Sequence, residues 1–143
     1  MPDIFRDFAI TAKRGAVFAA ITLPSGLDAW WTKTSAGVPT AGALYYLGIG
    51  PGYEWRARVT EVVPNECFEL QIIKADEDWT DTRVRFELLA ASGVTPVHFR
   101  HLGWASNNDV YRVSCFCWAL YLRHLRRYVE HRERLPYEQR INA

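Results

Sequence analysis

The chain has 143 residues, which is enough for one domain with its own apolar core. Hydrophobic residues make up 49% of it and charged residues 23%, so the composition excludes an intrinsically disordered chain. The formal net charge of +1 argues against a general nucleic-acid binder, which needs concentrated positive charge. Aromatic residues reach 14%, and such a set either packs a dense core or lines a cavity for an organic ligand.

The cysteines and the apolar runs bear on the compartment. Three cysteines, an odd number, are typical of a reducing environment, so the cytoplasm is the expected location. No apolar run approaches the roughly 18 residues that span a membrane, and the charged N-terminus lacks a signal-peptide pattern. Cys115 and Cys117 would point about 200° apart on a helix, which disfavours a shared metal. We therefore predict no metal, no cofactor and no membrane partner.

The first third of the chain predicts one strand and two short helices. Residues 4–10 alternate between the two faces of a strand, and Thr11 is a suitable N-cap for a helix over residues 12–21. Pro24 and its neighbours interrupt that helix, and a second short helix is expected over residues 27–32. Residues 34–42, rich in Gly, Pro, Ser and Thr, are expected to form a loop.

Five strands are predicted next, separated by short turns rich in Gly, Pro, Asn and Asp. Short connections favour hairpins, so the strands should form an antiparallel meander. Pro96 lies inside the fifth strand and predicts a local bulge or loss of pairing, because proline has no N–H to donate. The expected strands are residues 43–49, 53–63, 67–74, 82–90 and 95–102.

The last third predicts one long amphipathic helix over residues 108–134, which contains neither Gly nor Pro and would span about 40 Å. Its apolar face recurs at steps of three and four residues, at Val110, Ser114, Trp118, Leu122, Leu125 and Val129. We expect a single domain over residues 1–135, followed by a polar, frayed tail over residues 136–143. The order β-α-α-β5-α predicts an α+β fold in which a curved antiparallel sheet wraps around the final helix.

Three stretches also carry a family resemblance. The first runs from Ala16 to Trp31 and ends in a Trp-Trp pair; the second combines Gly42 with the segment Val59 to Glu66; the third links His101-Leu102-Gly103-Trp104 to the helix around Trp118. In order and spacing they resemble the helix-grip fold of the START/SRPBCC superfamily, the birch-pollen-allergen-like proteins. Within it, the chain looks most like the homologues of the activator of heat-shock-protein-90 ATPase. Cys117, where the family usually has a small residue, is a departure from the pattern.

The resemblance and the aromatic content together imply an apolar cavity between the sheet and the long helix. His101 should share the inward face of its strand with Val97 and Phe99, either as a structural histidine or as an anchor or general base. Trp30 and Trp31 should point to different sides, one into the core and one toward the cavity mouth. The candidate cavity residues are Trp30, Trp31, Tyr53, Trp55, Phe68, Phe86, Phe99, His101, Trp104, Ser114, Trp118 and Tyr121.

The charged residues are predicted to have structural roles that need no ligand or partner. Arg56, Arg58, Arg83 and Arg85 are expected to pair with glutamates across strands on the outer face of the sheet. The acidic run Asp76-Glu77-Asp78 is typical of a hairpin turn. The basic side chains of the last helix, including His124, are expected to form a solvated face.

Three functions remain open from the sequence. The favoured one is a cytoplasmic protein, monomer or homodimer, that binds a hydrophobic or aromatic small molecule. The alternatives are an enzyme of the cyclase, aromatase or hydrolase type that uses His101 with Tyr45, Tyr46, Tyr121 or Glu61, and a chaperone-interaction module. Fold by itself does not choose among them.

Overall fold

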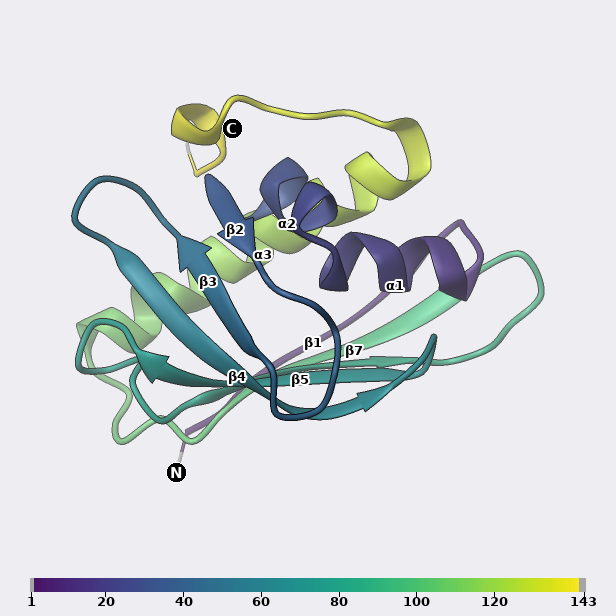
Figure 1. Cartoon of the computed structure of the whole chain (residues 1–143). Helices are drawn as coiled ribbons and strands as arrows, with labels where there is room; N and C mark the ends of the chain where they lie inside the picture. Colours follow the sequence, from purple (N-terminus) through teal and green to yellow (C-terminus); the bar gives the residue numbers. More distant parts are fainter. Residues whose placement is uncertain (1, 142–143) are drawn as a thin grey trace.

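A curved antiparallel sheet and one long helix dominate the computed structural model, which describes residues 2–141 (Figure 1). The seven strands lie in the order β1-β7-β6-β5-β4-β3-β2, and the long helix α3 crosses one face of the sheet. This confirms the predicted helix-grip α+β fold. The elements are β1 Ile4–Ile10, α1 Arg14–Thr22, α2 Pro24–Trp30, β2 Thr34–Ala36, β3 Leu44–Gly48, β4 Glu54–Val63, β5 Cys67–Lys74, β6 Arg83–Leu88, β7 Thr95–Leu102, α3 Asp109–His131 and the short 3-10 helix η1 Tyr137–Gln139.

Two irregularities in the pairing of β4 with β5 bend the sheet. The pairing register between β4 and β5 shifts between Arg56 and Ala57 and again between Val59 and Glu61. A bulge adds a residue to one strand, so it bends that strand and increases the local twist. The bent sheet presents a concave face, and α3 lies along it (Figure 1).

One expectation about the strands was wrong, and another holds on one side of a strand. Residues 34–36, expected in a loop, form the edge strand β2, which pairs with β3 through Thr34↔Gly48 and Ser35↔Leu47. Three residues are too few for a readable alternation of side chains. Pro96 is paired with Ala9 of β1 but not with β6, because the β6–β7 ladder ends at Leu88↔Val97; the expected loss of pairing is therefore present on one side, without a register shift. The carbonyl of Pro96 accepts from Leu89 N, so the proline nitrogen also faces the β6 side of the strand. Because β6 ends at Leu88, the missing N–H removes no hydrogen bond from the ladder.

The start of α1 also differs from the prediction. Thr11 is not its N-cap: the backbone N–H of Thr11 donates to the Glu130 carboxylate of α3 at 2.7 Å, and α1 begins only at Arg14. Pro24 opens α2, at the helix position where a missing N–H costs nothing, and α2 ends at Trp30, two residues before the expected end. Gly26 lets the two helices touch, since a Cβ there would lie 2.6 Å from the backbone of Ala20.

The long helix begins and ends with recognisable caps. The Asn108 side chain accepts from Tyr111 N at 3.0 Å, and Arg132 ends the helix in the left-handed conformation, with φ of 59°. Along the predicted apolar face, Trp118, Leu122 and Leu125 are buried, whereas Val110 remains 38% exposed. The apolar face is therefore covered toward its C-terminal part and partly open at its beginning.

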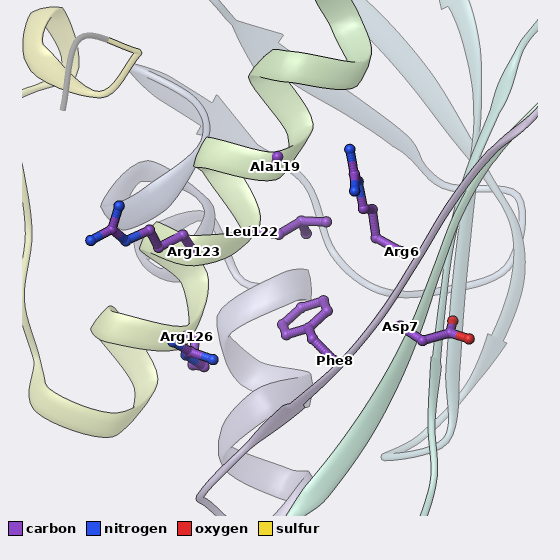
Figure 2. A pocket seen from close by; sticks show the side chains of 7 residues that line it. All are labelled: Arg6, Asp7, Phe8, Ala119, Leu122, Arg123 and Arg126. Carbon is purple, nitrogen blue, oxygen red and sulfur yellow. The ribbon is translucent and has the colours of Figure 1, made fainter.

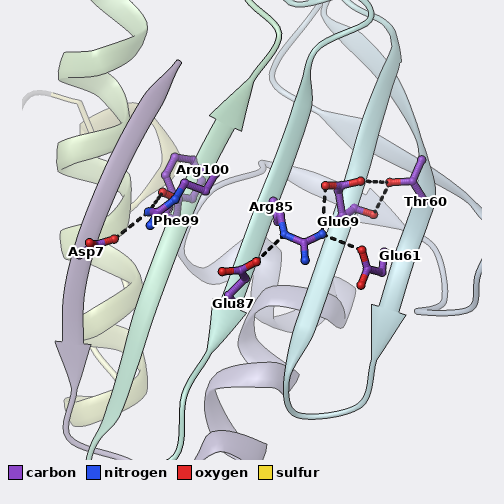
Figure 3. Close-up of polar contacts among 8 residues, drawn as sticks. All are labelled: Asp7, Thr60, Glu61, Glu69, Arg85, Glu87, Phe99 and Arg100. Atoms are coloured by element: carbon purple, nitrogen blue, oxygen red, sulfur yellow. Dashed lines mark hydrogen bonds and ion pairs between the residues drawn. The ribbon is translucent and has the colours of Figure 1, made fainter. Parts of the chain in front are cut away.

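The basic side chains on the outer face of the sheet are only partly paired as expected. Arg85 donates to Glu61 and Glu87 at 2.8 Å and to Glu69 at 3.2 Å, across three strands (Figure 3). Its guanidinium holds the pKa of Glu61 below its ordinary value. Arg56 instead stacks on the ring of Tyr46, 4.6 Å from its centroid.

The segment after Pro136 is anchored to the rest of the fold by Tyr137 and Arg140, although Glu138, Gln139 and Ile141 are exposed, so the expectation of a frayed tail does not hold at these two residues. Residues 142 and 143, like Met1, lie outside the described residues. Arg140 is 4% exposed, and its guanidinium donates to the carbonyls of Asp28, Thr32 and Leu135 at 2.7–3.1 Å. His124 is also buried, and its Nε2 donates to the carbonyl of Arg140. The solvated face expected of α3 therefore does not include His124.

We expect Arg140→Ala to lower the free energy of unfolding by about 2–3 kcal/mol, because three carbonyls lose a charged donor. Urea unfolding followed by far-UV circular dichroism measures the change. Arg134→Ala, a fully matched substitution at an exposed position six residues earlier, should stay within about 0.5 kcal/mol of the parent. Equal stability of both variants would show that the segment contributes nothing.

Candidate functional site

A cavity of about 360 Å³ lies between the sheet and the first half of α3. Its α3 residues all fall between Asp109 and Tyr121, and the opposite walls come from the end of α2, the end of β3, β4 and the turn between β5 and β6. The lining is mostly apolar, as expected of a site for a small organic molecule. The lining residues are Trp31, Ile49, Trp55, Asp76, Trp79, Asp109, Val110, Val113, Ser114, Cys117 and Tyr121.

Indole rings form the inner walls of this cavity. The ring centroids of Trp55 and Trp79 lie 4.9 Å apart, and Trp79 stacks on Trp118 at 5.8 Å. Trp31 contacts Trp118 from the other side, with 5.1 Å between the centroids. Trp118 is 1% exposed and does not itself line the cavity. It supports the lining indoles from behind, so their positions are fixed before any ligand enters.

Trp79 lines the cavity although it is not among the candidate cavity residues. It directly follows the acidic run at 76–78, which predicts a hairpin turn. In the structure it is 9% exposed, and its Nε1 donates to Ser114 Oγ on α3 at 3.1 Å. A single tryptophan within an otherwise polar turn was the available signal, since so large an apolar surface favours burial.

His101 is buried and held on both ring nitrogens. Trp118 Nε1 donates to His101 Nδ1 at 3.0 Å, and because an indole only donates, Nδ1 must be unprotonated. The proton of the neutral ring therefore lies on Nε2, which donates to Thr82 Oγ1 at 2.8 Å. Thr82 Oγ1 in turn donates to the carbonyl of Trp79 at 2.5 Å. Burial lowers the pKa of His101 from its ordinary 6.5 to about 3.

The twelve candidate cavity residues thus separate into three groups. Trp31, Trp55, Ser114 and Tyr121 line the cavity. Tyr53 precedes β4 and is 50% exposed. The remaining seven are buried in the packed interior and do not line the cavity. Trp30, for example, is covered by the ring of Trp31, on which it stacks. These seven are Trp30, Phe68, Phe86, Phe99, His101, Trp104 and Trp118.

The polar groups of the cavity are mostly uncharged. Burial raises the pKa of the Cys117 thiol and of the Tyr121 hydroxyl above their ordinary values, so both stay neutral near pH 7. Two carboxylates, Asp76 and Asp109, lie at the rim, and Asp109 forms an ion pair with Arg112. No group of three or more acidic, histidine or cysteine side chains within residues 2–141 is placed to hold a metal ion.

A second depression, of about 320 Å³, lies between β1 and the middle of α3 (Figure 2). Phe8 and Leu122 form its apolar floor, and the guanidinium groups of Arg6, Arg123 and Arg126 surround it (Figure 2). All three arginines are exposed to solvent. Because the charged side chains are well hydrated, this groove is a poorer site for an apolar molecule than the tryptophan-lined cavity.

His101 generates a testable dependence of stability on pH. Its folded pKa lies below the unfolded value, so between about pH 3 and 6.5 the unfolded chain binds a proton that the folded chain does not. The free energy of unfolding should therefore fall as the pH drops below 6.5, by up to about 1.4 kcal/mol per pH unit from this residue. Above pH 6.5 the contribution is constant.

Urea unfolding at pH 7.5, 6.0 and 5.0, for the parent and for His101→Gln, measures this contribution. The variant keeps an amide that can donate and accept, yet it cannot titrate. All other acidic and basic groups are shared, so the difference between the two pH slopes belongs to His101. Parallel slopes would contradict the neutral, buried histidine.

Comparison with known proteins places this geometry in a family. The family described as activator of Hsp90 ATPase homolog 1-like protein matches residues 11–130. No curated protein matches the chain in sequence. None of the helices within residues 2–141 is long and apolar enough to cross a membrane.

Solved structures agree with this assignment. The Aha1 dimer from Colwellia psychrerythraea superimposes with a TM-score of 0.83 at 26% identity, covering 92% of this chain and 98% of that one. Protein MLL2253 from Mesorhizobium loti gives 0.80 at 17% identity, covering 94% and 100%. Protein SSP2350 from Staphylococcus saprophyticus gives 0.78 at 17% identity, covering 94% and 96%. With the family match extending over most of its length, the chain belongs to the activator of Hsp90 ATPase homolog 1-like family within the SRPBCC superfamily.

Proposed function

We propose that the protein binds a small hydrophobic or aromatic molecule in the cavity between the sheet and the first half of α3. The observation that carries this proposal is a cavity of about 360 Å³ whose walls are formed chiefly by tryptophan and aliphatic side chains. An unfilled apolar cavity costs stability that one more aromatic side chain would restore. Its retention in the fold therefore favours a role as a binding site.

The support for binding over catalysis comes from His101. An acid–base catalyst needs a free ring nitrogen within reach of a substrate and a pKa near the working pH. Both nitrogens of His101 are hydrogen-bonded, the side chain is fully buried, and its pKa is about 3. Glu61, another catalytic candidate, lies on the outer face of the sheet beside Arg85 (Figure 3). The geometry thus favours a structural histidine and a binding protein.

The free cysteines and one structural neighbour bear on the proposed location and assembly of the protein. Cys67, Cys115 and Cys117 are all free thiols, which supports the proposed cytoplasmic location. The similarity to a dimeric Aha1 supports a homodimer as one of the two assembly states expected from the sequence. A chaperone-interaction role stays a prediction from the family resemblance.

The neutral fluorescent probe N-phenyl-1-naphthylamine tests the binding proposal. We expect its emission to rise and shift to the blue on addition of the protein, with a dissociation constant on the order of 10 μM. Val113→Trp should weaken binding about tenfold or more, because Val113 lines the cavity and an indole there occupies it.

Phe116→Trp is the matched control. Phe116 lies on the same helix, is 60% exposed like Val113, and does not line the cavity, so its substitution should leave probe binding unchanged. Equal loss in both variants, or no saturable binding by the parent, would exclude the cavity as the site. Far-UV circular dichroism confirms that the variants fold.

A further inference from the structure

We infer that the cavity selects an organic cation, such as an aromatic or alkyl ammonium, over neutral and anionic molecules of the same shape. This inference rests on the proposed function, since it concerns which molecule the same cavity takes. It follows from two properties of the lining: the π systems of its walls and the sign of its charges.

The walls of the cavity offer several aromatic faces to a ligand. Trp31, Trp55 and Trp79 line the cavity together with Tyr121. The N–H of Trp79 is already donated to Ser114, so the indole presents its ring, not its donor, to a ligand. The face of an aromatic ring carries negative potential and attracts a cation within about 6 Å of its centroid, and tryptophan does so most strongly.

The charges of the cavity have one sign. Asp76 and Asp109 lie at its rim, whereas no Lys, Arg or His among residues 2–141 lines it. Arg112 pairs with one of the two carboxylates, at Asp109. The carboxylate of Asp76 forms no ion pair within the described part of the chain and is exposed at the mouth. A carboxylate or sulfonate ligand would meet the unpaired carboxylate of Asp76, whereas an ammonium group would be attracted to it.

Three nearby sources of positive charge do not reverse this sign. Lys74 borders a separate depression together with Asp76, but it forms no ion pair with that carboxylate and does not line the cavity. Arg140 lies behind the cavity, but its guanidinium donates to three backbone carbonyls and does not line the cavity. The N-terminus of α3 carries a positive partial charge at the rim. Asn108 caps it, however, and Asp109 in the first turn compensates it.

Three probes of one shape separate charge from size: phenyltrimethylammonium, tert-butylbenzene and benzenesulfonate. Each carries a tetrahedral head on a phenyl ring, with a charge of plus one, zero and minus one respectively. Their competition against N-phenyl-1-naphthylamine is measured at low ionic strength. We expect the cation to bind on the order of tenfold more tightly than the neutral molecule, and the anion to bind most weakly.

Two substitutions assign the preference to its sources. Asp76→Asn should lower the affinity for phenyltrimethylammonium about threefold and leave that for tert-butylbenzene unchanged. Its matched control is Asp81→Asn in the same turn, which removes the same charge outside the cavity and places asparagine at a left-handed position that asparagine tolerates. Trp55→Leu keeps an apolar wall but removes a π face, so it should reduce the affinity for the cation more than that for the neutral probe.

The outcomes distinguish the two proposals. If the naphthylamine binds in the cavity but the cation competes no better than tert-butylbenzene, the charge selectivity is wrong and the binding function stands. If benzenesulfonate competes best, the sign assigned to the cavity is wrong. If Asp76→Asn and Asp81→Asn lower cation binding equally, the attraction comes from overall charge and not from this site. If no probe binds, the binding function itself fails.

Discussion

The buried hydrogen bonds around His101 join the parts of the molecule that make the cavity. Trp118 of α3 donates to His101 of β7, His101 donates to Thr82 at the start of β6, and Thr82 donates to the backbone of Trp79. One neutral imidazole therefore links the helix α3, the strand β7 and the β5–β6 turn. Each bond leaves an unpaired buried group if it is lost, so the three elements hold one another in place.

This network also explains why the interior is full at one end and open at the other. Around the imidazole the aromatic rings pack closely: the centroid of Trp104 lies 4.8 Å from that of His101, and the centroids of Phe99 and Trp118 are 4.5 Å apart. Toward the N-terminus of α3 the helix presents Val110 and Val113, whose side chains are too small to fill the space opposite Trp55 and Trp79. The cavity is thus a consequence of small side chains opposite large ones.

The positively charged side chains are engaged away from the cavity. Arg85 is engaged with three glutamates on the outer face of the sheet, and Arg140 with backbone carbonyls behind α2 (Figure 3). The arginines of β1 and α3 surround a different groove (Figure 2). The two aspartates at the rim are what remains in contact with the cavity, and its electrostatic character follows from that placement more than from the net charge of the chain.

Local sequence patterns were sufficient for most of the architecture. The alternation in residues 67–74 and 95–102 gave the bounds of β5 and β7, and the spacing of Trp118, Leu122 and Leu125 identified the buried face of α3, because period two and period 3.6 are properties of a single element. The inward position of His101 followed from the same alternation. Helix starts were less readable, since the N–H of Thr11 is bound by a carboxylate 119 residues away.

The tertiary structure alone decided which inward residues touch empty space. Phe68, Phe86 and Trp118 share their faces with Trp55 and Ser114, yet the former are enclosed by other side chains and the latter border the cavity. Trp79 enters the site from a polar turn, and Arg140 enters the interior from a polar tail, through partners 35 and about 110 positions away. The sequence by itself determined the elements, their order, their buried faces and the family. Packing and long-range hydrogen bonds, which join residues that no local pattern connects, determined the cavity.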